Sequence, residues 1–246
     1  MKRARGDSVV RGVEIRVTRL LNHQSTQIAQ ILERLQRLER PLAIDTETWT
    51  NVAQPGELAF HKRPNIRSGE DWEKTNAAFW ERRGFSPDGW TGKFIVDVGA
   101  GSRLRTLYFK GARIAAIEPL ADKFMAEVEW QDLDRADEVY AVPAEEGVAE
   151  LHGRADLIVS MNALDHGYDF EAAIANISRY LKPDGVAHLS FDPHDRPDDL
   201  HQLLLDDRSA REVFAHCGLK VERFEQWGRY HAGPGPKALH YWLRPE

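Results

Sequence analysis

Two short apolar segments, at residues 94–98 and 114–118, constrain the fold of this chain more than any other feature. The first runs directly into a Gly-Ala-Gly turn at residues 99–101, and the second ends in Glu118. Apolar runs of this length are typical of strands buried in a parallel sheet. Glycines after such a strand let the backbone approach a ligand, and an acid about 20 residues further on can bind ribose hydroxyls. Together the two segments predict a nucleoside pocket.

Segments typical of strands and helices alternate from residue 93 to the end of the chain. The predicted strands cover residues 94–98, 114–118, 138–142, 156–161 and 186–192, and helices are predicted near 103–110, 120–129 and 169–180. This alternation predicts an α/β fold, a mostly parallel sheet with helices on both faces. A helix near 198–216 is followed by segments 219–224 and 238–243 with no helix between them, so we expect these two to pair as an antiparallel hairpin.

Three segments differ in composition. Residues 1–40 are charged and helical in their second half, residues 41–92 are irregular and rich in tryptophan, and residues 93–246 hold the alternating strands and helices. We expect a helical N-terminal extension, a segment that covers the site or binds substrate, and a ligand-binding domain. Leu21 and Ile28 are seven residues apart and begin an apolar seam. That seam either packs on its own domain or joins two copies of the chain in a homodimer.

The middle segment contains one predicted helix, which ends near Arg83. Ser68 is the expected N-cap of this helix. Trp72 and Phe79 are seven residues apart and therefore share one helix face. That face is either an aromatic wall over the acceptor pocket or, in the preferred interpretation, part of the core.

The composition argues against several classes of protein. The formal net charge is −6, whereas a nucleic-acid-binding domain usually has a strongly basic face. The single cysteine, Cys217, cannot form an internal disulfide and fits a reducing compartment. No apolar segment is long enough for a membrane span, and no signal peptide is recognised. We expect a cytoplasmic protein.

The residues around the glycine turn narrow the choice of nucleoside. A dinucleotide fold favours the pattern G-x-G-x-x-G, but Leu104 stands at the third glycine position. Asp97 lies just before the turn, where a carboxylate offers nothing to a pyrophosphate. A cationic or zwitterionic ligand would gain from it.

At these residues the chain resembles the class I S-adenosylmethionine-dependent methyltransferases, over roughly residues 70–246. Residues 96–102 resemble their first motif, and Glu118 matches their ribose-binding acid. Residues 156–166 resemble their fourth-strand motif, and residues 179–185 resemble the turn before their fifth strand. The resemblance implies a Rossmann-like, seven-stranded sheet that ends in the antiparallel hairpin. Its four motifs stand in the family's order.

The resemblance also implies roles for individual residues. The backbone at the glycine turn should approach the methionine moiety and the sugar, Asp97 should hold the methionine ammonium, and Glu118 should bind the ribose. The predicted cofactor-binding residues are Asp97, Gly99, Ala100, Gly101, Glu118, Ala144, Glu145, Asn162 and Ala163. Where the family often has an acid that contacts the adenine, this chain has Pro143. The backbone of Ala144 or the side chain of Glu145 could replace it, although a solvated acid at a helix start is the preferred interpretation of Glu145.

Candidate catalytic residues follow the fourth and fifth strands. A hydroxyl acceptor must lose a proton during methyl transfer, so a base would help. His166 is the first candidate base because an unperturbed histidine titrates near neutral pH, and His194 is the second. With Asp165 and Asp192, His194 could also form a metal site. A solvated polar loop is the preferred interpretation, so no metal is expected.

A basic cluster formed by His61, Lys62 and Arg67 precedes the ligand-binding domain. It could grip a phosphate on the acceptor, or it could be a solvated loop. Residues 57–85 also look like methyltransferases associated with bacterial surface-polysaccharide synthesis, which favours a sugar or glycan hydroxyl as the acceptor. We therefore expect O-methylation of a small-molecule or glycan acceptor. A non-catalytic methyltransferase-like subunit and a nicotinamide-dependent oxidoreductase are the alternatives.

Overall fold

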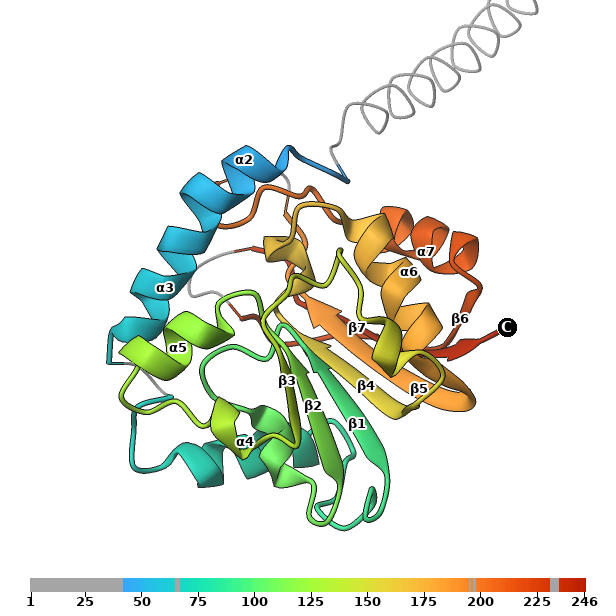
Figure 1. Ribbon diagram of the computed structural model, residues 1–246. Helices are drawn as coiled ribbons and strands as arrows, with labels where there is room; N and C mark the ends of the chain where they lie inside the picture. The colour runs from blue at the N-terminus through green and yellow to red at the C-terminus, as the bar shows by residue number, and fades with distance from the viewer. Residues whose placement is uncertain (1–41, 65–66, 195, 197, 231–234) are drawn as a thin grey trace, which may run out of the picture. The chain divides into compact units, whose positions relative to one another are not determined.

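Figure 1 shows a computed structural model of the chain, which describes residues 42–64, 67–194, 196, 198–230 and 235–246. Residues 42–246 form one compact unit. The predicted N-terminal extension at residues 1–40, with its apolar seam, lies outside the described residues. Among the described residues, we find no helix with the length and apolar character needed to cross a bilayer.

A seven-stranded sheet with the order β3-β2-β1-β4-β5-β7-β6 forms the centre of this unit (Figure 1). Its strands are β1 (Phe94–Val98), β2 (Arg113–Ile117), β3 (Glu138–Tyr140), β4 (Ala155–Met161), β5 (Leu181–Phe191), β6 (Leu219–Gln226) and β7 (Leu239–Pro245). Strands β1 to β5 pair in parallel, whereas β7 is antiparallel to both β5 and β6. The predicted mostly parallel sheet and its closing antiparallel hairpin are confirmed.

Helices cover both faces of the sheet (Figure 1). The α-helices are α2 (Thr46–Thr48), α3 (Gln54–Lys62), α4 (Trp72–Glu81), α5 (Ala121–Glu127), α6 (Phe170–Tyr180) and α7 (Asp207–His216). A π-helical turn, η1 (Trp49–Ala53), joins α2 to α3, and short 3₁₀ turns are η2 (Arg105–Tyr108), η3 (Leu133–Arg135), η4 (Ala149–Leu151) and η5 (Leu164–His166).

The alternation of side chains along the strands gives each face its own core. Val96 packs in one cluster with Ile174 of α6 and Phe214 of α7. Its neighbour Ile95 points the other way and packs with Trp80 of α4. All five residues of β1 are buried, which is why the segment reads as a continuous apolar run rather than an alternating one.

Three expectations about helix positions and one about a helix cap are wrong. Residues 46–62, predicted to be irregular, are helical through α2, η1 and α3. The helix expected at 198–216 begins only at Asp207, because the capping box of Asp206 and Ser209 starts it there. The helix expected at 103–110 is reduced to the 3₁₀ turn η2. The N-cap of α4 is Asp71 rather than Ser68, and Asp71 makes no side-chain capping bond.

The register of the parallel strands decides where the site lies. Val98 pairs with Ile117, so β1 and β2 end side by side at the carboxyl edge of the sheet. The N–H group of Gly99 donates to the carbonyl of Ile117 at 2.9 Å and continues this pairing into the turn. Residues that follow β1 and β2 therefore share one edge, where ligands bind in open α/β sheets.

Candidate functional site

A pocket with an empty volume of ≈ 920 Å³, counting its open mouth, lies at this edge. The volume is within the range of small-molecule sites, about 300–1,000 Å³. Residues after β1, β2 and β4 form its floor, and residues of η1 and α3 form a wall. All the predicted cofactor-binding residues line it, namely Asp97, Gly99, Ala100, Gly101, Glu118, Ala144, Glu145, Asn162 and Ala163.

The glycine turn closes the floor of the pocket against the loop after β4. Gly99 has a φ of +69° and Gly101 a φ of +67°, which residues with a side chain rarely adopt. A Cβ atom on Gly99 would stand 2.2 Å from the Cβ of Ala163. Glycine is therefore required at residue 99 both by its backbone angle and by the contact between the two loops.

Glu118 is held in place by two backbone donors. Its Oε2 accepts a hydrogen bond from the N–H of Gly101 at 2.8 Å, and its Oε1 accepts one from the N–H of Leu120 at 3.0 Å. Burial raises the pKa of this carboxyl group to about 7 in spite of these bonds. A carboxylate has about four lone-pair positions, so two remain for hydroxyl groups of a ligand in the pocket.

Asp97 is a second buried acid on the pocket floor, with 4% of its surface exposed. Its Oδ2 accepts a hydrogen bond from the Thr106 hydroxyl at 2.8 Å, which fixes the carboxyl group. Burial raises its pKa to about 6. A positively charged group in the pocket would compensate for that burial.

Glu145 closes the pocket on the side of the loop after β4. Its Oε1 accepts hydrogen bonds from the N–H groups of Tyr168 at 2.7 Å and Asp169 at 3.3 Å. Burial raises its pKa. The preferred interpretation of Glu145 as a solvated acid is therefore wrong. Pro143 and Ala144 line the pocket beside it.

Asn162 follows β4 in a strained conformation. Its φ of 57° is the one positive φ found at a non-glycine residue among the described residues. The side-chain amide lies 3.3 Å from Nε2 of His166, and its Oδ1 is buried without a hydrogen-bond partner among the described residues. Strain of this kind concentrates at functional sites, and the buried Oδ1 gives the pocket an acceptor for a ligand.

His166 and Glu57 form an ion pair in the wall of the pocket. Nδ1 of His166 lies 2.7 Å from Oε1 of Glu57. Burial by itself would lower the pKa of His166, but the carboxylates of Asp165 and Glu57 raise it to about 9. Trp49 fixes the histidine backbone by donating from Nε1 to its carbonyl at 2.9 Å.

The three predicted substrate-binding residues separate in the structure. His61 and Arg67 line the pocket, whereas the Lys62 side chain is half exposed and pairs with Glu127 at 2.7 Å. His61 lies beneath the glycine turn, where its Nδ1 accepts a hydrogen bond from the N–H of Ser102 at 3.2 Å. Burial lowers the pKa of His61 to about 3, so the ring is neutral.

His194, the second predicted catalytic residue, does not line the pocket. Its Nε2 lies 3.0 Å from Oδ2 of Asp165, behind the pocket wall. Asp192 does not join this pair, because its carboxylate accepts the N–H of Tyr230 at 3.1 and 3.2 Å. His201 approaches the pair instead.

The sequence analysis missed several pocket residues in the segment before the sheet. Trp49, Gln54 and Glu57 line the pocket from η1 and α3. One signal was present: Glu57 and His61 are four residues apart, so on a helix they share a face. Because residues 41–92 were predicted to be irregular, the helix face shared by Glu57 and His61 was not recognised.

Arg105 also lines the pocket, and it packs against Trp72 and Phe79, the two aromatic residues predicted to share one helix face. Its guanidinium group lies 4.8 Å from the ring of Trp72 and 4.1 Å from the ring of Phe79. Neither aromatic residue lines the pocket itself, and Trp72 is buried. Burial lowers the pKa of Arg105 to about 9, so it remains a cation at neutral pH with a fixed orientation.

Comparisons with known proteins agree with this geometry. A family profile described as a methyltransferase domain matches residues 69–230, more than half of the chain. The match begins before α4 and includes β1, the glycine turn and Glu118. A comparison with curated protein sequences gives no significant match.

Several solved structures share the fold. The 1,6-didemethyltoxoflavin-N1-methyltransferase of Burkholderia thailandensis, with 1,6-didemethyltoxoflavin and S-adenosylhomocysteine bound, is 20% identical with a TM-score of 0.57, covering 83% of this chain and 92% of that chain. A SAM-dependent methyltransferase from Leishmania major is 16% identical with a TM-score of 0.56, covering 77% and 82%. An S-adenosylmethionine-dependent methyltransferase from Clostridium acetobutylicum is 11% identical with a TM-score of 0.53, covering 73% and 94%.

Proposed function

Because this chain belongs to the methyltransferase domain family, we propose that it transfers the methyl group of S-adenosylmethionine to a small-molecule acceptor bound in the same pocket. The observation that carries the proposal is the meeting of Asp97, the glycine turn and Glu118 on one pocket floor. Each is held by its own hydrogen bonds or by packing before any ligand binds. When bound, S-adenosylmethionine supplies an electrophilic methyl group on a sulfonium centre, so the protein's task is alignment.

The residues of the floor suit the two polar ends of that cofactor. Glu118, with two lone-pair positions left, would accept hydrogen bonds from the ribose hydroxyls. Asp97 would balance the ammonium of the methionine moiety, which offsets the cost of burying this acid. Ala144, Glu145, Asn162 and Ala163 would surround the rest of the nucleoside. The contact of Ala144 or Glu145 with the adenine remains a prediction.

We expect the affinity for S-adenosylhomocysteine to fall as the pH is lowered from about 8 to 5. Burial raises the pKa of Glu118 to about 7 and that of Asp97 to about 6. Protonation of either acid removes the charge that the ligand would use. Titration calorimetry at several pH values measures the effect. In Glu118→Gln the decline near pH 7 should be absent.

The free energy of unfolding of the unliganded chain should depend on pH in the opposite direction from the affinity, through the same carboxyl groups. A carboxyl group whose pKa is raised by folding contributes stability that is complete below its unfolded pKa and is lost as the pH rises through its folded pKa. For Glu118 this window runs from 4.5 to about 7. An affinity for S-adenosylhomocysteine that stays constant over pH 5–8 would contradict the cofactor-binding roles of both Glu118 and Asp97.

The acceptor end of the pocket is polar, and this favours a hydroxyl acceptor. Nδ1 of His166 lies 2.7 Å from Oε1 of Glu57, and Arg67 and Arg105 line the same pocket. We assign the Glu57–His166 pair, rather than His166 alone, to the acceptor hydroxyl, which must lose its proton during transfer. Because the pKa of His166 is raised to about 9, the ring can accept that proton only in its deprotonated form, so turnover should rise as the pH approaches 9. The arginines suit an anionic group on the acceptor. A sugar or glycan that carries both a hydroxyl and an anionic group such as a phosphate, as the sequence suggests, is one such acceptor.

The experiment that tests the proposed function identifies the acceptor directly. The full chain is incubated with S-adenosylmethionine carrying a ¹³C-labelled methyl group and with fractions of a cell extract, and the labelled product is purified. The chemical shift of the methyl carbon distinguishes an O-methyl from an N-methyl product. Labelling on nitrogen would contradict the hydroxyl acceptor but support the transferase. Tight binding of the cofactor with no labelled product in any fraction would favour a non-catalytic subunit.

Once an acceptor is known, Glu57→Gln and His166→Gln should each lower kcat by about 100-fold or more, the usual contribution of proton transfer. The affinity for S-adenosylhomocysteine should change little, because neither Glu57 nor His166 forms a hydrogen bond with Glu118 or Asp97. Lys62→Gln is the matched control, since Lys62 pairs with Glu127 outside the pocket. Full turnover in Glu57→Gln would remove the pair from the reaction.

A further inference from the structure

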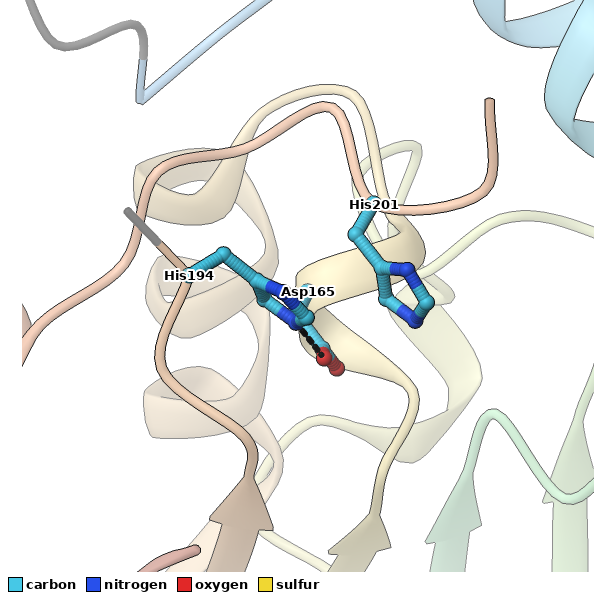
Figure 2. A group of neighbouring side chains, drawn as sticks. All are labelled: Asp165, His194 and His201. Carbon is cyan, nitrogen blue, oxygen red and sulfur yellow. Dashed lines mark hydrogen bonds and ion pairs between the residues drawn. The ribbon is translucent and has the colours of Figure 1, made fainter. Parts of the chain in front are cut away.

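Three side chains of types that can bind a metal ion, Asp165, His194 and His201, lie close together (Figure 2). Asp165 lies in η5, directly after β4. His194 and His201 lie in the connection between β5 and α7. Because β4 and β5 are parallel neighbours, these loops leave the sheet at the same carboxyl edge. Residues separated by about 30 positions in the sequence are thereby brought together.

The spacing of the three side chains is close to that of a metal site. One ligand atom from each lies within 4.8 Å of the others. Nε2 of His194 is 3.0 Å from Oδ2 of Asp165, and the rings of His194 and His201 stack with their centroids 4.3 Å apart. Ligand atoms around a tetrahedral ion at about 2.0–2.1 Å lie roughly 3.3 Å from one another. The spacing of up to 4.8 Å is wider than this, so the side chains would have to rotate toward one another to coordinate an ion.

A neighbouring carboxylate prepares His201 for coordination. Oδ1 of Asp198 lies 2.9 Å from Nδ1 of His201 and also accepts the backbone N–H of His201 at 2.8 Å. A carboxylate can only accept a hydrogen bond, so Nδ1 carries the proton and the lone pair of the ring is on Nε2. Histidines that bind metals usually donate their other ring N–H to a carboxylate in this way.

The three side chains are largely shielded from solvent. The side chain of Asp165 is fully buried, that of His201 is 5% exposed and that of His194 is 14% exposed. Their burial is already offset by pairing, of Asp165 with His194 and of His201 with Asp198, so burial by itself does not require an ion. Two imidazoles and one carboxylate are a donor set that suits Zn²⁺ and other divalent first-row transition ions.

We propose that Asp165, His194 and His201 form a binding site for one divalent transition-metal ion, for which Zn²⁺ is the test ion. The sequence analysis expected no metal, because it preferred to interpret these residues as a solvated polar loop, and it considered Asp192 rather than His201 beside Asp165 and His194. The ion would fasten the connection between β5 and α7 to η5. The ring of His201 lies against that of His166, with centroids 4.2 Å apart. The metal site would therefore brace the pocket wall that carries His166.

The test uses the full chain, purified without a polyhistidine tag and stripped of metal with a chelator. Zn²⁺ is titrated calorimetrically, and Co²⁺ is titrated while its visible d–d absorption is recorded. We expect about one ion per chain. Asp198→Asn should weaken binding by about 10- to 100-fold, and His194→Gln and His201→Gln should weaken it more. His216→Gln, at an exposed histidine that pairs with Glu171, is the control and should bind as the unaltered chain does.

Asp198 is exposed, so Asp198→Asn should fold even where a substitution at the buried His201 does not. Calorimetry with S-adenosylhomocysteine, which involves none of these residues, reports whether each variant keeps its pocket. Zn²⁺ affinity that is equal in the unaltered chain, His194→Gln and Asp198→Asn would overturn the proposal. So would a Co²⁺ spectrum without the absorption of a coordinated ion. The proposed methyl transfer would stand in either case.

Discussion

Replacing Glu118 by alanine is expected to weaken the binding of S-adenosylhomocysteine by roughly 30- to 150-fold. Hydrogen bonds to a charged group contribute about 1.5–3 kcal/mol, and each 1.4 kcal/mol corresponds to about a tenfold change in affinity. Glu118 lines the pocket, and its two carboxylate oxygens are oriented by the N–H groups of Gly101 and Leu120. The loss should therefore lie near the upper end of that range. Titration calorimetry at pH 8, where Glu118 is ionised, measures it.

Glu138→Ala is the matched control for this prediction. Glu138 is likewise a glutamate at one end of a strand, but it pairs with Arg113 and Arg154 at the start of β3 and does not line the pocket. Its removal should leave the affinity unchanged. A Glu118→Ala variant that folds and binds within about threefold of the unaltered chain, or less than 1 kcal/mol, would reject the ribose role of Glu118.

The second large effect is expected from Gly99→Ala. The backbone angle alone costs about 1–2 kcal/mol for a residue with a side chain. The added Cβ would stand 2.2 Å from the Cβ of Ala163, and overpacking of this kind costs about 1–3 kcal/mol more. We expect the free energy of unfolding to fall by about 2–5 kcal/mol. Denaturant unfolding measures the loss.

Two variants separate the collision from the backbone strain. Gly153 has a similar φ of +65° but nothing within 4 Å of the Cβ position, so Gly153→Ala should lose only the 1–2 kcal/mol due to strain. Ala163→Gly removes the atom that the new Cβ meets. Added to Gly99→Ala, it should recover part of the lost stability. Equal losses in Gly99→Ala and Gly153→Ala would mean that the loops do not collide.

Much of the site's floor was predictable because its residues follow buried parallel strands. Asp97 and the glycine turn end β1, Glu118 follows β2, and Asn162 follows β4. Strand ends of a parallel sheet meet at one edge, so local patterns were enough to bring these residues together. The departure at Pro143 was also visible in the sequence, although the burial of Glu145 was not.

The wall of the pocket could not be predicted in the same way. Glu57, His61 and Lys62 lie within six residues of one another, and the face of α3 decides which of them enter the pocket. Glu57 and His61 turn inward, whereas Lys62 pairs with Glu127 of α5. That choice depends on how α3 packs against distant parts of the chain, and no local signal encodes it.

The sequence by itself determined the order of the motifs along the chain, the edge of the sheet at which the pocket lies and the closing hairpin. These features depend on the periodicity of apolar residues and on turn residues, which act over a few neighbouring positions. The tertiary structure alone decided which histidines meet. It placed His166 beside Glu57 and grouped His194 with Asp165 and His201. The physical reason is that such pairings depend on the paths of loops that connect separate strands. Those paths are set by packing across the whole sheet rather than by the residues of the loops.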